Sequence, residues 1–282
     1  CHPSIASCTY SGCDLFGIYI QEGESEEEVI DKYMERLADF IEKNPSDGLI
    51  RGTGWVLGNF PGDRVPTRHD IDKVCGDTKA IQMAGVDADT PDVRAGRIYR
   101  EEDGFPQGIF NDPEAMNLIK ENVPGYDFSV EKYKEAFLYY QQQCANRYGV
   151  TLVQDCMHSN NAREAFRELA EEGKLTLRIR GTYLAEPGKA GDELEEALKR
   201  KATGADDVGN DFRIDTVKMF AEGLFSLTEP YEESFIRGNG LPDGYNEPLY
   251  WSDEEFVETA GAAMEAGFSV HVHAMGDNSV RQ

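Results

Sequence analysis

Apolar and polar residues alternate along the chain with a helical period in several long segments. Ser25-Glu-Glu-Glu28 matches a capping box, and apolar residues at helical spacing follow it as far as Asn44-Pro45. Ser252-Asp-Glu-Glu255 is a second capping box and predicts another capped helix. The sequence therefore predicts amphipathic helices over residues 25–44, 129–148, 160–172, 192–201 and 252–266.

Short apolar runs between these helices predict strands over residues 49–55, 150–155, 175–183, 212–220 and 268–273. From Gly149 onward strands and helices alternate, which is typical of parallel strands joined by crossover helices. A TIM barrel and a doubly wound sheet both fit this order. No strand is followed by a glycine-rich nucleotide-binding motif, so the barrel is favoured. Segments 58–108 and 224–250 are expected to be long loops that wall the active site.

The composition argues against two classes of partner. The chain has 28 Lys and Arg residues against 53 Asp and Glu residues, a net charge of −25. Because phosphates bind basic surfaces, we expect neither nucleic acid nor an anionic membrane as a partner. No apolar run approaches the roughly 18–20 residues that a membrane span requires. The six cysteines contain no C-x-x-C pair, and scattered thiols of this kind favour a reducing, cytoplasmic location.

The segment Phe268-Ser-Val-His-Val-His273 ends the last predicted strand with two histidines. His273 falls at the carboxyl end of this strand, where parallel barrels gather their active-site residues. The period-two alternation of a strand places His271 on the same side. A buried, hydrogen-bonded histidine is the alternative interpretation. Asp277 lies in the turn that follows, where it either anchors that loop or caps the next helix.

Lys218 is unusual because it lies in an apolar strand, Ile214-Asp-Thr-Val-Lys-Met-Phe220. A buried, unpaired ammonium group is costly, so such a lysine has a depressed pKa, a partner or a chemical modification. A neutral amine can react with carbon dioxide to give a carbamate, whose two oxygens can bridge two divalent cations. A Schiff-base lysine and a snorkelling surface lysine are the alternatives.

Three other histidines and one aspartate complete the candidates. His2 could share a metal with a histidine two residues earlier, but alone it is uninformative. Asp155 ends a predicted strand, and His158 follows it on a loop that could border the site. A structural role is the alternative for His158. His69 lies at an apparent helix start and is expected at the surface.

Taken together, these residues resemble the amidohydrolase superfamily, and in particular its YtcJ-like branch, which includes N-substituted formamide deformylases. The resemblance extends over essentially the whole chain and depends on the order and spacing of several motifs. These motifs are Gly52-Thr-Gly-Trp55, Pro66-Thr-Arg68 with Asp70 and Asp72, Gly104–Gly108, Gly149–Asp155, Val217–Gly223 and Val270–Asp277.

The resemblance implies a metal-dependent hydrolase on an α/β fold, a distorted (β/α)8 TIM barrel over residues 1–282. It implies one or two zinc ions as the cofactor, with His2, Lys218 and His273 as ligands and Lys218 carboxylated. A metal-activated water would hydrolyse a carbon–nitrogen bond in a small-molecule amide, N-acyl or N-formyl substrate. A homodimer is a possible assembly.

The remaining candidates take supporting roles under this resemblance. Asp155, Asp277 and His158 are expected to support the ligands or to anchor the loops around the site. His271 is interpreted as a neighbour that packs within the barrel.

The expected barrel is incomplete in this chain. The family's first His-x-His histidine, N-terminal β-sandwich, sixth-strand histidine and eighth-strand aspartate have no counterpart here. We therefore expect the chain by itself to be inactive or nearly so. Family segments are also missing at Asp77–Thr78, near Val93–Arg94 and near Ser226–Leu227, and we hypothesise that the flanking residues are not contiguous in the parent protein. The functional alternatives are a Schiff-base lyase or aldolase that uses Lys218, and a catalytically inactive regulatory relative.

Overall fold

The computed structural model describes residues 2–9, 12–45, 48–55, 59–60, 64–94, 96–111, 113–238, 241 and 243–282. The chain divides into two compact units. The first, which we call the sheet unit, comprises residues 1–11, 127–222 and 249–282. The second, the hairpin unit, comprises residues 12–126 and 223–248. All three expected metal ligands belong to the sheet unit.

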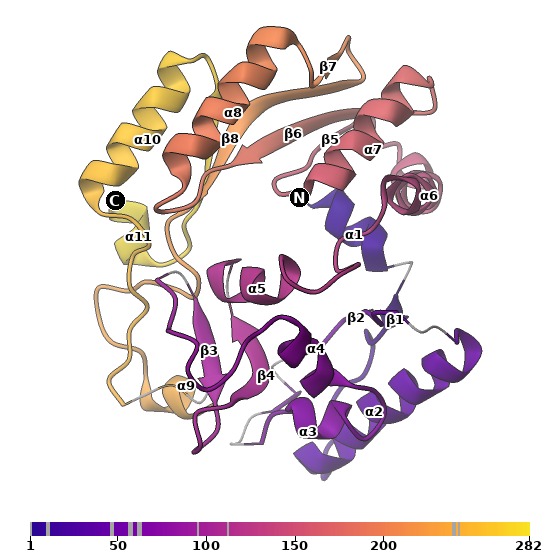
Figure 1. Ribbon diagram of the computed structural model, residues 1–282, viewed down its shortest axis with the longest axis vertical. Coiled ribbons are helices and arrows are strands. Elements are labelled where there is room, and N and C mark those ends of the chain that lie inside the picture. The colour runs from indigo at the N-terminus through magenta and orange to yellow at the C-terminus, as the bar shows by residue number, and fades with distance from the viewer. Residues whose placement is uncertain are drawn as a thin grey trace. The chain divides into compact units, whose positions relative to one another are not determined.

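The sheet unit is built on four parallel strands. β5 (Leu152–Gln154), β6 (Arg178–Leu184), β8 (Phe212–Phe220) and β9 (Ser269–His273) pair in that order, and the short β7 (Asp207–Val208) pairs antiparallel with β8. Helices connect the parallel strands (Figure 1). The predicted pattern of parallel strands with crossover helices is thus confirmed in this unit, and the carboxyl ends of the four strands meet at one edge.

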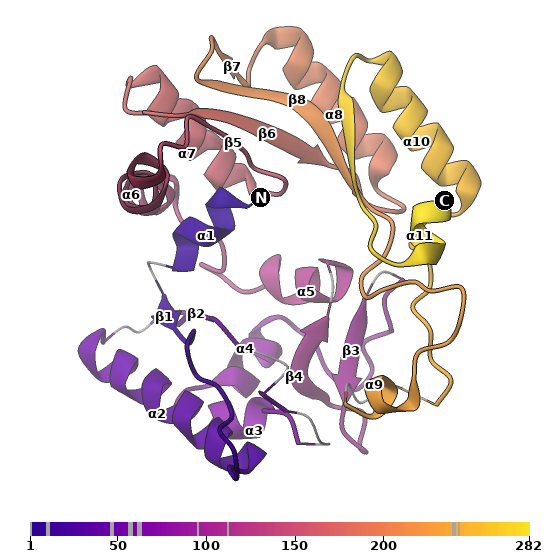
Figure 2. The ribbon, with the colours of Figure 1, turned by 180° about the vertical axis from the view of Figure 1, so that it is seen from behind.

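Three helices connect these strands. α7 (Asn160–Glu171) follows β5, α8 (Ala190–Thr203) follows β6, and α10 (Asp253–Glu265) precedes β9. The fully buried ring of Phe166 on α7 lies 6.3 Å from the ring of Phe212 on β8. α8 and α10 run side by side along the sheet (Figures 1 and 2). The apolar positions at helical spacing in α7 therefore face the sheet, and their burial stabilises the unit.

The helix ends follow local sequence rules. The capping boxes predicted at Ser25 and Ser252 are both formed, at the start of α2 (Glu26–Lys43) and of α10. α6 (Val130–Tyr140) continues through short π- and 3-10-helical turns to Gly149, whose φ is 69°. Because glycine adopts a positive φ without strain, this long helical segment ends where the sequence predicted.

The hairpin unit contains two small sheets. β3 (Arg97–Arg100) and β4 (Pro106–Asn111) form an antiparallel hairpin, and β1 (Cys13–Asp14) pairs in parallel with β2 (Gly52–Thr53). The strand predicted over residues 49–55 is therefore only two residues long. The hairpin was not predicted, because strands this short carry no clear alternation in the sequence.

Short helices also lie in segments that were predicted as loops. They are α3 (Arg68–Ile71) and α4 (Asp77–Met83), together with α9 (Glu233–Gly238) in the second loop segment, while α5 (Pro113–Lys120) follows β4. Asp77 and Thr78, the pair between which a segment was expected to be missing, both lie in the first turn of α4. Among the described residues, no helix has both the length and the apolar character needed to cross a bilayer.

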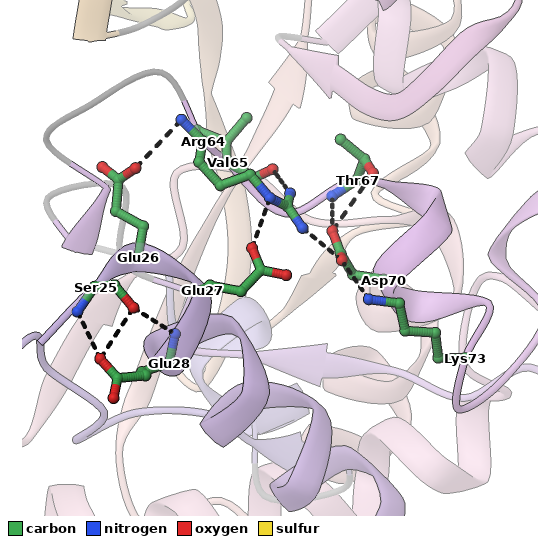
Figure 3. Close-up of polar contacts among 9 residues, drawn as sticks. All are labelled: Ser25, Glu26, Glu27, Glu28, Arg64, Val65, Thr67, Asp70 and Lys73. Atoms are coloured by element: carbon green, nitrogen blue, oxygen red, sulfur yellow. Dashed lines mark hydrogen bonds and ion pairs between the residues drawn. The ribbon is translucent and has the colours of Figure 1, made fainter.

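A charged network ties the start of α2 to α3 (Figure 3). The Arg64 guanidinium donates to the carboxylates of Asp70, at 2.6 Å, and Glu27, at 3.0 Å. Lys73 also donates to Asp70, at 3.1 Å. Asp70 is almost fully buried. Its negative charge is matched by the positive charges of Arg64 and Lys73, which belong to the same unit.

Candidate functional site

The candidate site lies on the adjacent strands β8 and β9 of the sheet unit. The parallel register pairs Lys218 with His271 and Phe220 with His273. These residues occupy the carboxyl-terminal halves of both strands, which is where the sequence predicted the chemistry. Since alternate residues of a strand share a face, His271 and His273 lie on the same side of β9.

Lys218 is buried without an acidic partner. Its residue is 3 % exposed, and among the residues that the structure describes it makes no ion pair or hydrogen bond. Nζ instead lies 4.4 Å from the centre of the Phe220 ring, an arrangement in which the ring face partly compensates the charge. Burial lowers the pKa of Lys218 and so favours the neutral amine.

His2 joins this group from the other end of the chain. Burial lowers the pKa of His2, and the positive charge of Lys218 and the neighbouring His271 and His273 lower it further. Burial likewise lowers the pKa of both strand histidines, and Lys218 adds to the effect in each. The structure therefore brings His2, Lys218 and His273, the three residues expected to bind metal, within electrostatic reach of one another.

His271 differs from the sequence-based interpretation. It is only partly buried, and it lies directly opposite Lys218 in the register. Its Nδ1 is shielded from solvent and has no hydrogen-bond partner among the described residues. A buried ring nitrogen without a hydrogen bond destabilises the folded protein unless a group outside the described residues bonds to it. We therefore include His271 in the site cluster.

These donors fit a divalent cation only if Lys218 takes part. Within the described ranges, no group of three or more His, Cys, Asp or Glu side chains is placed to hold a metal. Imidazole nitrogens are common ligands of zinc, and the cluster provides those of His2 and His273. Lys218 is the further polar side chain that the register places beside the histidines of β9.

Asp155 anchors the segment that carries His2. It follows β5, is fully buried, and accepts the backbone N–H of Ser4 at 2.9 Å. Ser4 lies in α1 (Pro3–Thr9), directly after His2. Burial raises the pKa of Asp155 to about 6, although the hydrogen bonds from Ser4 oppose the shift. Asp155 thus contacts the backbone beside an expected ligand.

Glu222 is a buried site residue that sequence analysis missed. Its carboxylate is fully buried and accepts the backbone N–H groups of Met275 and of Gly276, the latter at 2.8 Å. Burial and Lys218 lower the pKa of His273, whereas Glu222 raises it. The available signal was an acidic residue two positions after an apolar strand, within the motif Val217–Gly223.

His158 has a structural environment. Its Nε2 accepts the N–H of Thr182 at 3.3 Å, and its Nδ1 lies 3.4 Å from the carbonyl of Ser159. Burial lowers the pKa of His158 to about 4, so the ring is neutral. A Cβ on Gly181 would lie 2.8 Å from Nε2, and the backbone approaches the imidazole this closely because residue 181 is glycine.

Asp277 and His69 lie outside the cluster of expected ligands. Asp277 is exposed and is the first residue of α11 (Asp277–Arg281), whose N-cap is Gly276. The alternative of an Asp277 N-cap is therefore wrong by one residue. His69 is exposed in the hairpin unit and pairs with Glu101 at 2.7 Å, and its expected surface position is confirmed.

Comparison with known proteins gives a consistent picture. A model of the Amidohydrolase family matches residues 19–282. The exoenzymes regulatory protein AepA of Pectobacterium carotovorum subsp. carotovorum is 24% identical over 272 residues, which cover 89% of this chain and 56% of AepA. The putative amidohydrolase YtcJ of Bacillus subtilis (strain 168) is 26% identical over 83% of this chain and 45% of YtcJ. The N-substituted formamide deformylase of Arthrobacter pascens is 20% identical over 89% of this chain and 48% of that enzyme.

Two solved structures share the fold. Both are described as uncharacterized metal-dependent hydrolases, from Pyrococcus furiosus and Pyrococcus horikoshii OT3. Their TM-scores are 0.58 and 0.61 at 23% and 20% identity, and 99% of this chain is covered in each. The matches cover 54% and 53% of those chains. The chain thus spans about half the length of the relatives it matches.

Proposed function

The chain belongs to the amidohydrolase family, and from this premise we propose that it carries metal-binding residues of a hydrolase that cleaves a carbon–nitrogen bond. The observation that carries the proposal is the cluster on β8 and β9, where a buried lysine without an acidic partner lies beside two histidines. The metal-dependent hydrolases that share the fold support it.

His2, Lys218 and His273 would hold the cation, and zinc suits a set of two imidazole nitrogens and a carbamate oxygen. When bound, such a cation lowers the pKa of a water molecule and polarises a carbonyl group. The protein's own contribution is to fix the two imidazoles and the lysine in place. Asp155 and Glu222 support this role, because each accepts hydrogen bonds from the backbone next to an expected ligand.

Lys218 would act as a carbamate. The Nζ lone pair forms a bond to the carbon of carbon dioxide, one C=O electron pair moves onto oxygen, and the nitrogen releases one proton to water. This reaction needs the neutral amine, which burial favours. A carbamate anion would also give the buried Nδ1 of His271 a group to which it can donate.

The proposed substrate is a small-molecule amide that carries an N-acyl or N-formyl group. The relative named N-substituted formamide deformylase supports this class. When such an amide is hydrolysed, the oxygen of water bonds to the carbonyl carbon and the C–N bond breaks. The amine leaves with one proton from that water. The segments that surround the site in the intact protein would then choose among amides.

Zinc binding by the purified protein in bicarbonate buffer tests the proposal directly. Equilibrium dialysis should show one or two zinc ions per chain. His273→Ala and Lys218→Met should each weaken binding by at least roughly 100-fold, since even residues behind the ligands contribute 10–100-fold to metal affinity. His69→Ala is the matched control, because this exposed histidine belongs to the hairpin unit, and it should bind zinc like the wild type.

Carbon-13 NMR in labelled bicarbonate checks the state of Lys218 independently. A carbamate resonance should be present in the wild type and absent in Lys218→Met. The metal proposal fails if the wild type, His273→Ala and His69→Ala take up the same amount of zinc. Borohydride trapping of a carbonyl compound on Lys218 would instead support the Schiff-base alternative.

A second candidate function is regulatory binding without catalysis. The observation that favours it is the relative named as the exoenzymes regulatory protein AepA. Under this alternative the fold persists but the protein takes up no stoichiometric zinc. The same dialysis therefore separates the two candidates.

A further inference from the structure

The turn that follows β9 depends on a side chain from the neighbouring strand. Residues 274–276 connect His273 to α11, whose N-cap is Gly276. The amides of Met275 and Gly276 both donate to one oxygen, Oε1 of Glu222. A carboxylate from outside the turn thus accepts two of its backbone N–H groups.

Glu222 is held at a fixed position relative to both strands. It comes two residues after β8 ends and four residues after Lys218. The backbone N–H of Ala221 donates to the carbonyl of His273 at 2.9 Å, so the end of β8 contacts the end of β9 directly. The indole of Trp251 donates to the carbonyl of Phe220 at 2.8 Å on the same stretch.

The burial of Glu222 is costly in a way that stability alone does not explain. Its residue is 0% exposed, and a buried carboxylate loses its hydration. A fully buried apolar side chain would stabilise the same position without this cost. What the carboxylate adds is a pair of charge-assisted hydrogen bonds, which are short and directional and fix backbone geometry.

We infer that Glu222 is a positioning residue that holds the 274–276 turn against the end of β8 and thereby fixes the His273 imidazole relative to Lys218. The inference rests on the proposed function, because it assigns His273 as a metal ligand. It adds a residue that would not touch the metal. Its effect would reach the site through the backbone of the turn.

Cobalt binding and amide exchange test this role in the intact chain. Glu222→Leu removes both hydrogen bonds, and we expect it to weaken Co²⁺ binding by about 10–100-fold and to change the visible Co²⁺ spectrum. Glu222→Gln keeps an oxygen that can accept both amides, and it should recover most of the affinity. In hydrogen–deuterium exchange, the Met275 and Gly276 amides should exchange faster in Glu222→Leu than in the wild type or Glu222→Gln.

Asp70→Asn is the matched control, because it also removes a buried carboxylate but lies in the hairpin unit. It should lose stability and keep wild-type Co²⁺ affinity and spectrum. If Glu222→Leu does not fold, Gly276→Pro breaks the same contact from the other side, since the Gly276 φ of −72° is one that proline adopts. It should weaken Co²⁺ binding in the same way.

The outcomes separate this inference from the proposed function. Wild-type Co²⁺ affinity and unchanged amide exchange in Glu222→Leu, or in Gly276→Pro if the former does not fold, would overturn the positioning role. Failure of His273→Ala to change Co²⁺ binding would overturn the metal site instead. In that case faster exchange of the two amides would still support Glu222 as the residue that holds the turn.

Discussion

Asp70 in the hairpin unit and Asp155 in the sheet unit are both buried carboxylates, yet their pKa values move in opposite directions. Burial by itself raises the pKa of each. At Asp70, hydrogen bonds from Arg64, the Thr67 backbone and Lys73 outweigh burial and lower the pKa to about 2 (Figure 3). Asp155 accepts hydrogen bonds from Ser4 and Met157, which do not offset burial, and its pKa rises to about 6.

A similar contrast separates the Arg64–Asp70 pair from Lys218. In the hairpin unit, Arg64 and Asp70 neutralise each other. In the sheet unit, Lys218 is buried, and among the described residues it forms no salt bridge with an acidic side chain. Matched charges of the first kind stabilise a fold. Unmatched ones cost stability, and they persist where they serve a site.

The contrast also predicts opposite pH dependences. The lowered pKa of Asp70 contributes stability above about pH 4, and that contribution is lost as the pH falls toward 2. The raised pKa of Asp155 has the opposite sign, because the folded state holds a proton that the unfolded state releases between about pH 4 and 6. The contribution of Asp155 to the free energy of unfolding therefore decreases as the pH rises from about 4 to 6.

The largest expected effect comes from Asp70→Asn. At pH 7 it should lower the free energy of unfolding by about 2 kcal/mol, since a shift of one pKa unit corresponds to about 1.4 kcal/mol. The loss should shrink as the pH falls through about 2, below which Asp70 is protonated in both states. Urea unfolding measured at several pH values checks both statements.

Asp155→Asn is the matched variant for this measurement. It should flatten the decrease in stability between about pH 4 and 6 rather than remove stability at neutral pH. A loss at pH 7 as large as that of Asp70→Asn would contradict the contrast between the two carboxylates.

A smaller effect of opposite sign is expected for Lys218→Met in the metal-free protein. Methionine fills the same buried space without an ammonium group, so the variant should gain on the order of 1–2 kcal/mol in buffer free of carbon dioxide. Thermal and urea unfolding both report this gain.

Lys32→Met provides the comparison in the hairpin unit. Lys32 is 40% exposed and pairs with Glu24, so its replacement should change stability by less than about 0.5 kcal/mol. Destabilisation by Lys218→Met would show that the amine already has a stabilising partner in the folded chain. Lys218 would then not be a buried lysine without a partner.

The smallest effects should be equal in the two units. Ser25→Ala and Ser252→Ala each remove the side chain of a formed capping box, and each should cost about 1 kcal/mol. Equal losses in urea unfolding would show that local interactions do not distinguish the units. Markedly unequal losses would place part of the contrast in helix capping rather than in the buried charges.

Local patterns account for the elements that sequence analysis predicted well. The helices at Ser25 and Ser252 begin at capping boxes, and the long helical segment before Gly149 ends at a residue that tolerates a positive φ. The strand predicted over 212–220 is β8 without change. Each of these features depends on residues within a few positions of one another, and the sequence displays such neighbours directly.

The β3–β4 hairpin and the β1–β2 pair could not be predicted in this way. Their strands have two to six residues, too few to show a clear period. The pairing of β1 with β2 also joins residues 39 positions apart, Cys13 and Gly52. Individual site candidates could be named from the sequence, because a lysine or histidine in an apolar strand is unusual by itself. The resemblance to a family then grouped His2, Lys218 and His273.

The sequence by itself determined the alternation of parallel strands and crossover helices in the sheet unit, the helix ends, and the candidates Lys218 and His273. Only the tertiary structure decided that His271 faces Lys218, that Asp155 holds the backbone beside His2, and that Glu222 holds the turn after His273. The reason is physical: the partners in these contacts lie 53 to 151 positions apart. No local period records a hydrogen bond between such distant residues, and it exists only once the strands have paired.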